Sequence, residues 1–184
     1  MAEALVIVDF QNDFTPPDGA LAVPEGDLIA DRLNDLIRSG RFDLVLATRD
    51  WHPPDHGSFD REGGVWPVHC VQDSEGAELH AALDREQLDA VIDKGQRPDT
   101  EGYSGFEGTE LAQLLRERAI DSVTVVGLAT DYCVRNTALD ALREGFEVTI
   151  DADAVRGVDV QPGDSERALE ELRAAGATVT QPRP

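Results

Sequence analysis

A repeated alternation of β-rich apolar runs with helical segments is the feature that most constrains how this chain folds. The apolar runs occupy residues 5–8, 44–47, 90–92, 123–126, 146–150 and 177–180. Segments with helical spacing of apolar residues occupy residues 27–38, 75–83, 109–118, 131–144 and 164–175. This alternation predicts a parallel sheet covered by helices on both faces. We therefore expect an α/β protein, a Rossmann-like three-layer α/β/α sandwich with a central, mostly parallel six-stranded sheet.

Length and charge narrow the classes of protein further. A chain of 184 residues is predicted to form a single domain over residues 1–184, with a sizeable core. The net charge of -21 argues against nucleic acid or an anionic membrane as a partner, because both would repel it. The same charge suggests a cytoplasm of high salt, where screening weakens self-repulsion.

The N-terminus and the cysteines bear on location. Residues 1–9 lack a basic region and meet an acidic residue at once, so they are interpreted as a first strand and not as a signal peptide. No apolar run approaches the ~20 residues that span a bilayer. We therefore expect a cytoplasmic protein, in which a disulfide between Cys70 and Cys133 is not expected. Cys70 is interpreted as a packing residue.

Chemically active side chains stand where the predicted strands end. Asp9 follows the first strand, Asp50 the second and Lys94 the third, and Cys133 lies in the first turn of the helix after the fourth. In parallel α/β sheets, ligands bind outside the carboxyl ends of the strands. The sequence therefore predicts that a carboxylate, an ammonium and a thiol converge at one edge of the sheet.

These residue types suit nucleophilic catalysis. A thiol at a helix N-terminus is expected to favour thiolate, and the free backbone amides there can hold an oxyanion. Asp9 is placed to take the thiol proton, and the nearby ammonium would stabilise thiolate further. Lys94 is the one lysine beside fifteen arginines. The plainer alternatives remain open: arginine bias for Lys94, a packed helix residue for Cys133, and a cap or a salt bridge for Asp9.

A second group combines a carboxylate with histidines. Asp50 and His52 are two residues apart and point the same way in an extended chain, and His69 lies further along the same predicted loop. One carboxylate and two imidazoles form a metal site with open positions, suited to zinc, iron(II) or manganese. His56 either adds a fourth ligand or is an ordinary loop histidine. Three unrelated loop histidines are the alternative for the whole group, and His80 is predicted on a surface helix.

At this point the chain resembles a known family along essentially its whole length. It is similar to the nicotinamidase/pyrazinamidase branch of the isochorismatase-like cysteine hydrolases. The matching motifs are VDFQNDF (8–14), TRDWHPPDH (48–56), WPVHC (66–70), DKG (93–95), YSGF (103–106) and GLATDYCV (127–134).

The resemblance implies roles for particular residues. It implies a catalytic triad of Asp9, Lys94 and Cys133. It implies one divalent metal ion, with zinc as the first choice, on Asp50, His52 and His69, and His56 is the nearest match to a further histidine ligand of some members. It implies an aromatic clamp of Phe14 and Trp66 with Tyr103 near the entrance, for which core packing and a surface ring are the alternatives. It also implies a cis peptide at Leu128-Ala129 that directs the Ala129 and Cys133 amides at the oxyanion.

The implied reaction converts nicotinamide to nicotinate and ammonia through a cysteine thioester, as in NAD salvage, with pyrazinamide as a further substrate. Two alternatives stay open. One is another cysteine amidase of the superfamily, such as an N-carbamoyl amide hydrolase, although such relatives generally lack the metal ligands. The other is a non-catalytic, zinc-stabilised α/β binding module. Members of the family range from monomers to rings, so a homo-oligomer is compatible with the resemblance.

Overall fold

The computed structural model describes residues 1–181, and residues 182–184, the end of the predicted domain, lie outside the described part. Its centre is a six-stranded sheet in the order β3-β2-β1-β4-β5-β6, and every neighbouring pair is parallel. The strands are β1 (Ala2–Val8), β2 (Leu44–Asp50), β3 (Ala90–Lys94), β4 (Ile120–Leu128), β5 (Glu147–Arg156) and β6 (Thr178–Val179). The α-helices are α1 (Ala30–Arg38), α2 (Leu111–Glu117), α3 (Arg135–Arg143) and α4 (Asp164–Ala175). The predicted α/β fold is confirmed.

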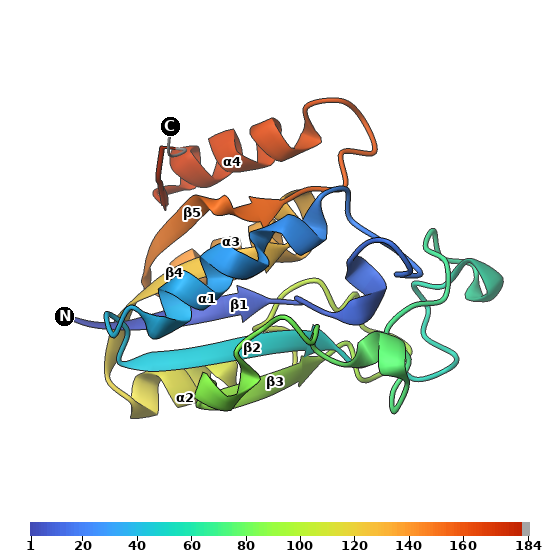
Figure 1. The fold of residues 1–184 in the computed structure, drawn as a ribbon, viewed down its shortest axis with the longest axis horizontal. Helices are drawn as coiled ribbons and strands as arrows, with labels where there is room; N and C mark the ends of the chain where they lie inside the picture. Colours follow the sequence, from blue (N-terminus) through green and yellow to red (C-terminus); the bar gives the residue numbers. More distant parts are fainter. Residues whose placement is uncertain (182–184) are drawn as a thin grey trace.

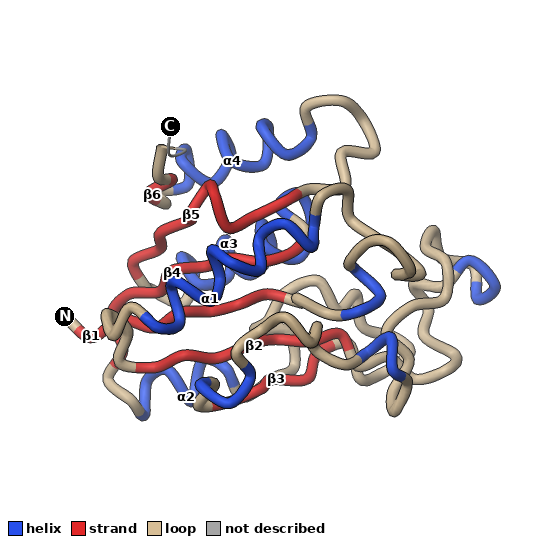
Figure 2. Tube along the Cα trace, viewed as in Figure 1, coloured by secondary structure: helices blue, strands red, loops and turns tan. Residues whose placement is uncertain are grey.

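Helices cover both faces of this sheet (Figures 1 and 2). On β1, the side chains of Ala4, Val6 and Val8 pack in a core that includes α2 and α3. Leu5 and Ile7, which alternate with them, pack in a second core that includes α1. This alternation follows the pleat of a strand that is buried on both faces. The three-layer arrangement therefore follows from the period of two along the central strand.

The strand order places a ligand-binding edge between β1 and β4. From β1 the chain continues outward through β2 and β3, whereas β4 lies on the other side of β1 and leads to β5 and β6. Such a reversal opens a crevice outside the carboxyl ends of the two central strands. The long loop after β2, coloured teal to green in Figure 1, gathers at this end of the sheet.

The predicted helix over residues 75–83 is wrong. Only a 3-10 turn, Glu75–Ala77, is present, and the Ser74 side chain caps it. The chain then becomes extended, because Leu79 forms an antiparallel bridge with Gln11, and the His80 amide donates to the Phe10 carbonyl. His80 is therefore not on a surface helix. Its half-buried ring lies 5.3 Å from the Phe10 ring, measured between centroids.

The predicted helices over residues 27–38 and 131–144 each begin with a turn that is not α-helical. Residues Gly26–Ile29 form a 3-10 turn before α1, and Thr130–Val134 form a π-helical turn before α3. The predicted helix over residues 164–175 has the observed bounds. Among residues 1–181, no helix is both long and apolar enough to cross a bilayer.

Candidate active site

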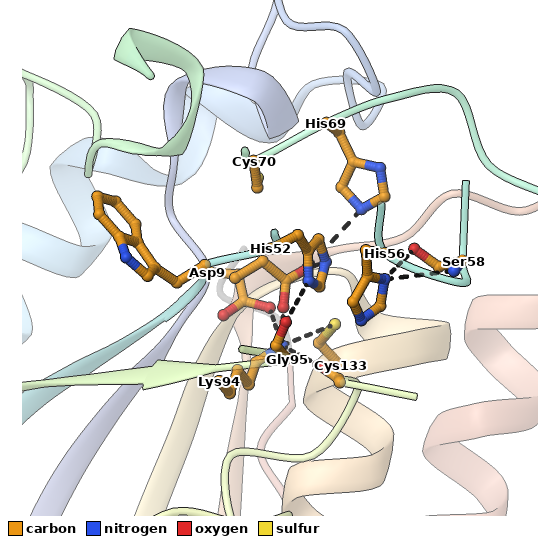
Figure 3. Close-up of polar contacts among 12 residues, drawn as sticks. Asp9, His52, His56, Ser58, His69, Cys70, Lys94, Gly95 and Cys133 are labelled. Atoms are coloured by element: carbon orange, nitrogen blue, oxygen red, sulfur yellow. Dashed lines mark hydrogen bonds and ion pairs between the residues drawn. The ribbon is translucent and has the colours of Figure 1, made fainter. Parts of the chain in front are cut away.

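Lys94 is the centre of a buried polar network at the carboxyl edge of the sheet (Figure 3). Its side chain is fully buried, and its register places it directly beside Asp50 on the neighbouring strand. The Nζ atom lies 2.8 Å from Asp9 Oδ2 and 2.5 Å from Asp50 Oδ1. It also donates to the Gly102 carbonyl at 2.5 Å and lies 3.5 Å from Cys133 Sγ. The structure thus brings the predicted lysine, both carboxylates and the thiol into contact.

The ionisation of the two carboxylates differs because their surroundings differ. Burial raises the pKa of Asp9 to about 6, against the opposing charge of Lys94. Burial also disfavours the Asp50 carboxylate, but Lys94 and His52 outweigh it and hold the pKa of Asp50 well below its usual range. Burial of Lys94 favours its neutral form, but the Asp50 and Asp9 carboxylates outweigh it and raise the pKa of Lys94 well above its usual value. Asp50 and Lys94 therefore form a permanent ion pair, and Asp9 can exchange a proton near neutral pH.

Cys133 is a neutral thiol in this network, contrary to the thiolate expected from its place at a helix start. Burial raises its pKa well above the ordinary value, Lys94 opposes this, and the Asp9 and Asp50 carboxylates raise the pKa further. The helix end and one ammonium do not outweigh burial beside two carboxylates. A carboxylate oxygen of Asp9 lies within 4.8 Å of the thiol sulfur. The nucleophile is thus available through a base beside the thiol that removes its proton, and not as a thiolate already present at rest.

Three imidazoles lie beside Asp50, each held through its Nδ1 atom. Nδ1 of His52 lies 2.8 Å from the Gly95 carbonyl, and Nδ1 of His69 lies 2.7 Å from the Pro67 carbonyl. Nδ1 of His56 lies 2.7 Å from the Ser58 hydroxyl. The carbonyl contacts of His52 and His69 require a proton on Nδ1 and leave the Nε2 lone pair for a cation. At His56 the Ser58 amide donates to Nδ1 at 3.3 Å, so the contacts there do not place the proton on Nδ1. Asp50 Oδ2 lies 3.3 Å from Nε2 of His52 and 4.0 Å from Nε2 of His69.

This donor set fits a divalent cation. Ligand atoms of Asp50, His52 and His69 lie within 4.8 Å of one another, and all three residues are buried. The His56 ring stacks on His52 with centroids 3.9 Å apart, and its buried Nε2 has no hydrogen-bond partner among the described residues. Burial lowers the pKa of His56 to about 4, so it is a neutral imidazole. Carboxylate and neutral imidazole are the donors that zinc and similar metals prefer.

A mostly apolar cavity opens next to the thiol and the histidines. Phe14, Trp66 and Tyr103, the predicted ring-binding residues, all line it, together with Cys133 and Ala129. The Trp66 indole N–H donates to the Tyr103 hydroxyl at 3.0 Å, and this bond joins two loops at the cavity. The peptide between Leu128 and Ala129 is cis, as predicted. A flat aromatic ligand would find ring faces and a nucleophile in one space.

Sequence reasoning missed several supporting residues. Thr48 donates to Asp9 Oδ1 at 2.7 Å, and the Gln11 side chain bonds both the amide and the carbonyl of Asp50 at 2.8 Å. Tyr132 adds a ring to the cavity wall, 5.0 Å from Trp66. Gly95 is a further case, since a Cβ there would lie 2.5 Å from the His52 ring. All four residues stand inside the matching sequence motifs, and this position is the sequence signal for them.

Comparison with known proteins agrees with this geometry. The chain is 46% identical to the nicotinamidase of Escherichia coli (strain K12), over 96% of this chain and 93% of that protein. It is similar to a pyrazinamidase of Pyrococcus horikoshii solved in complex with zinc, with a TM-score of 0.90, 51% identity and 98% and 99% of the two chains covered. It is also similar to PnC1 from L. infantum in complex with nicotinate, with a TM-score of 0.93, 38% identity and coverage of 98% and 92%. The isochorismatase domain matches residues 3–182, and the chain therefore belongs to the isochorismatase-domain family.

Proposed function

We propose that this protein is a metal-dependent nicotinamidase, which hydrolyses nicotinamide to nicotinate and ammonia through a thioester on Cys133. The observation that carries the proposal is the buried Lys94 ammonium in reach of Asp9, Asp50 and Cys133, beside a histidine cluster suited to a metal. The activities of the relatives described above support the same reaction. Pyrazinamide carries the same carboxamide on a similar ring and is proposed as a second substrate.

In the first half-reaction, Asp9 accepts the thiol proton of Cys133 while the sulfur attacks the carboxamide carbon. The carbonyl electron pair moves to oxygen, and the backbone amides of Ala129 and Cys133 donate to that oxyanion. As the oxyanion collapses, the C–N bond breaks and Asp9 returns its proton to the nitrogen, so that ammonia leaves. Lys94 stays charged and holds the carboxylate and the sulfur in place.

The second half-reaction releases the acid. A water molecule attacks the thioester carbon and gives a proton to Asp9. The C–S bond breaks, the sulfur regains the proton from Asp9, and nicotinate leaves. The apolar walls of the cavity exclude other water from the thioester between these steps.

We propose Asp50, His52 and His69 as the ligands of one divalent metal ion, with His56 as a further ligand. Zinc is the first choice, and iron(II) or manganese suits the same donors. A cation held there would act as a Lewis acid toward the ring nitrogen of the substrate. Phe14 and Trp66 hold the ring faces and Tyr103 lies near the entrance, so the carboxamide is turned toward Cys133.

The cluster of Asp50, His52 and His69 argues against an N-carbamoyl amide hydrolase, and the Asp9 carboxylate beside the Cys133 thiol argues against a binding module. One assay separates the three: ammonia release from nicotinamide by wild type, by Cys133→Ala and by a chelated sample. We expect turnover only in the metal-loaded wild type. An inactive metal-loaded wild type would refute the nicotinamidase proposal, full activity of Cys133→Ala would refute the thioester, and full activity after chelation would refute the metal role.

We further propose that residues 1–184 act as one hydrolase domain in the cytoplasm, without nucleic acid or membrane partners. The two cysteines are free and buried, which agrees with a reducing compartment. A homo-oligomer remains compatible with this proposal, and the sedimentation velocity of the purified chain measures it directly.

A further inference from the structure

Phe59 is buried among the three loop histidines but has no part in the mechanism proposed above. Its side chain is 0% exposed, and it is among the largest fully buried side chains of the described residues. The distances from its ring centroid are 5.8 Å to His52, 5.7 Å to His56 and 5.4 Å to His69. One phenyl ring therefore touches every imidazole of the cluster.

These contacts restrict the planes of the imidazoles. Phe59 lies nearly perpendicular to His52 and His69, at 80° and 72°, and is tilted by 59° to His56. Perpendicular ring pairs are favourable because a positive ring edge meets a negative ring face. The hydrogen bonds at Nδ1 hold one atom of each imidazole but leave the ring free to rotate about that atom. Contact with a rigid flat neighbour removes that freedom and sets the direction of Nε2.

The backbone of Phe59 also joins this cluster to the cavity wall. Its amide donates to the His56 carbonyl at 3.1 Å, and its carbonyl accepts from Gly64 at 2.8 Å. Phe59 forms a parallel bridge with Trp66, in which Trp66 donates to Ser58 at 3.0 Å and accepts from Asp60 at 2.7 Å. The same residue thus packs the histidines through its ring and ties down the loop of Trp66 through its main chain.

We propose that Phe59 is a positioning residue of the metal site, whose ring sets the orientation of the three imidazoles. The inference rests on the proposed metal site, but it does not depend on amidase turnover. Replacing residues that orient metal ligands from behind typically changes metal affinity by roughly 10–100-fold. Replacement of Phe59 by a side chain without a flat ring should weaken metal binding to the same extent.

The test compares zinc binding by metal-stripped wild type, Phe59→Leu and Phe146→Leu, each titrated against a chromophoric chelator. Phe146 is a matched control, because it is also a buried phenylalanine but packs against Phe106 in the sheet core. We expect Phe59→Leu to bind zinc roughly 10–100-fold more weakly and Phe146→Leu to bind like wild type. The visible spectrum of the cobalt(II)-loaded protein should change in the first variant and not in the second.

Equal zinc affinity and equal cobalt spectra in the two folded variants would overturn the proposal. If circular dichroism shows that Phe59→Leu does not fold, Phe59→Met, which fills the volume without a flat ring, is judged by the same criterion. Ammonia release by wild type is measured separately. A wild type without turnover would count against the proposed function, while the zinc titration would still decide the role of Phe59.

Discussion

The Nζ atom of Lys94 lies 2.5 Å from Oδ1 of Asp50, and the other oxygen of that carboxylate faces the Nε2 atoms of the histidine cluster. The Asp50 carboxylate therefore lies between the Lys94 ammonium and the imidazoles of the proposed metal site. Charges interact strongly at such distances, because the surroundings are poor in water. Changes on either side of Asp50 should therefore affect the whole site.

Replacement of Lys94 by arginine should nearly abolish activity although the charge is kept. A planar guanidinium is larger than an ammonium and cannot offer compact contacts to two carboxylates and a sulfur in a fully buried space. We expect kcat/KM for nicotinamide to fall by at least about 10³-fold, the scale of loss for a catalytic unit. Arg116→Lys, a swap at an exposed ion pair, is the control and should stay near wild type. A Lys94→Arg enzyme with near wild-type activity would remove the lysine from the mechanism.

The decrease of kcat/KM at low pH should follow the protonation of Asp9. Burial raises the pKa of this carboxyl to about 6, and only its ionised form can accept the thiol proton. Activity should therefore be present above this pKa and be lost as the pH falls through about 6, not through the ordinary value near 4. The measurement is kcat/KM across this range, with circular dichroism to show that the enzyme stays folded. Constant activity down to about pH 4 would contradict the assignment, and Asp9→Asn should be inactive throughout.

Loss of the metal should lower thermal stability as well as activity. An ion present at 100 times its dissociation constant adds about 2.7 kcal/mol to the folded state. For a chain of this length, that corresponds to a rise in Tm of about 5–10 °C. Calorimetry of the chelated and zinc-loaded protein measures this shift, and Asp50→Ala, which lacks a proposed ligand, should show little of it. An unchanged Tm on zinc addition to wild type would speak against a site at Asp50, His52 and His69.

Gln11→Leu should destabilise the fold, because Gln11 holds the backbone of Asp50. Its amide group bonds the Asp50 amide, the Asp50 carbonyl and the Ala77 carbonyl, each at 2.8 Å and each buried. Buried polar groups left without partners cost about 1–3 kcal/mol each, so the free energy of unfolding should fall by at least about 2 kcal/mol. Urea denaturation measures the change. Gln113→Leu, at an exposed side chain, is the control and should change stability by less than about 0.5 kcal/mol.

Stability should rise with salt if the charge of -21 reflects a saline cytoplasm. The Debye length falls from about 30 Å at 0.01 M to about 3 Å at 1 M, so repulsion among surface carboxylates weakens. We expect Tm to increase between low and molar KCl, and NaCl at equal ionic strength should act alike because screening is not ion-specific. A Tm that stays level or falls over this range would refute the hypothesis.

Much of the architecture was predictable because it depends on local patterns. The period of two in β1 and the helical spacing that follows each strand predict a parallel sheet with helices on both faces. Parallel strands end at one edge, so Asp9, Asp50, Lys94 and the segment with Cys133 had to lie near one another. The family motifs then attached roles to these positions, and those roles await the experiments above.

The tertiary structure decided what depends on neighbours distant in sequence. Residues 78–80 are extended because the segment around Gln11 offers backbone partners that a local helix would not have. Cys133 is a neutral thiol because two carboxylates from other strands and complete burial outweigh its helix end. In the sequence, Phe59 does not differ from other core phenylalanines, and only the fold shows that its ring packs against three imidazoles. The sequence by itself determined the fold and the residues at its ligand edge, whereas burial and long-range contacts decided their protonation, pairing and orientation.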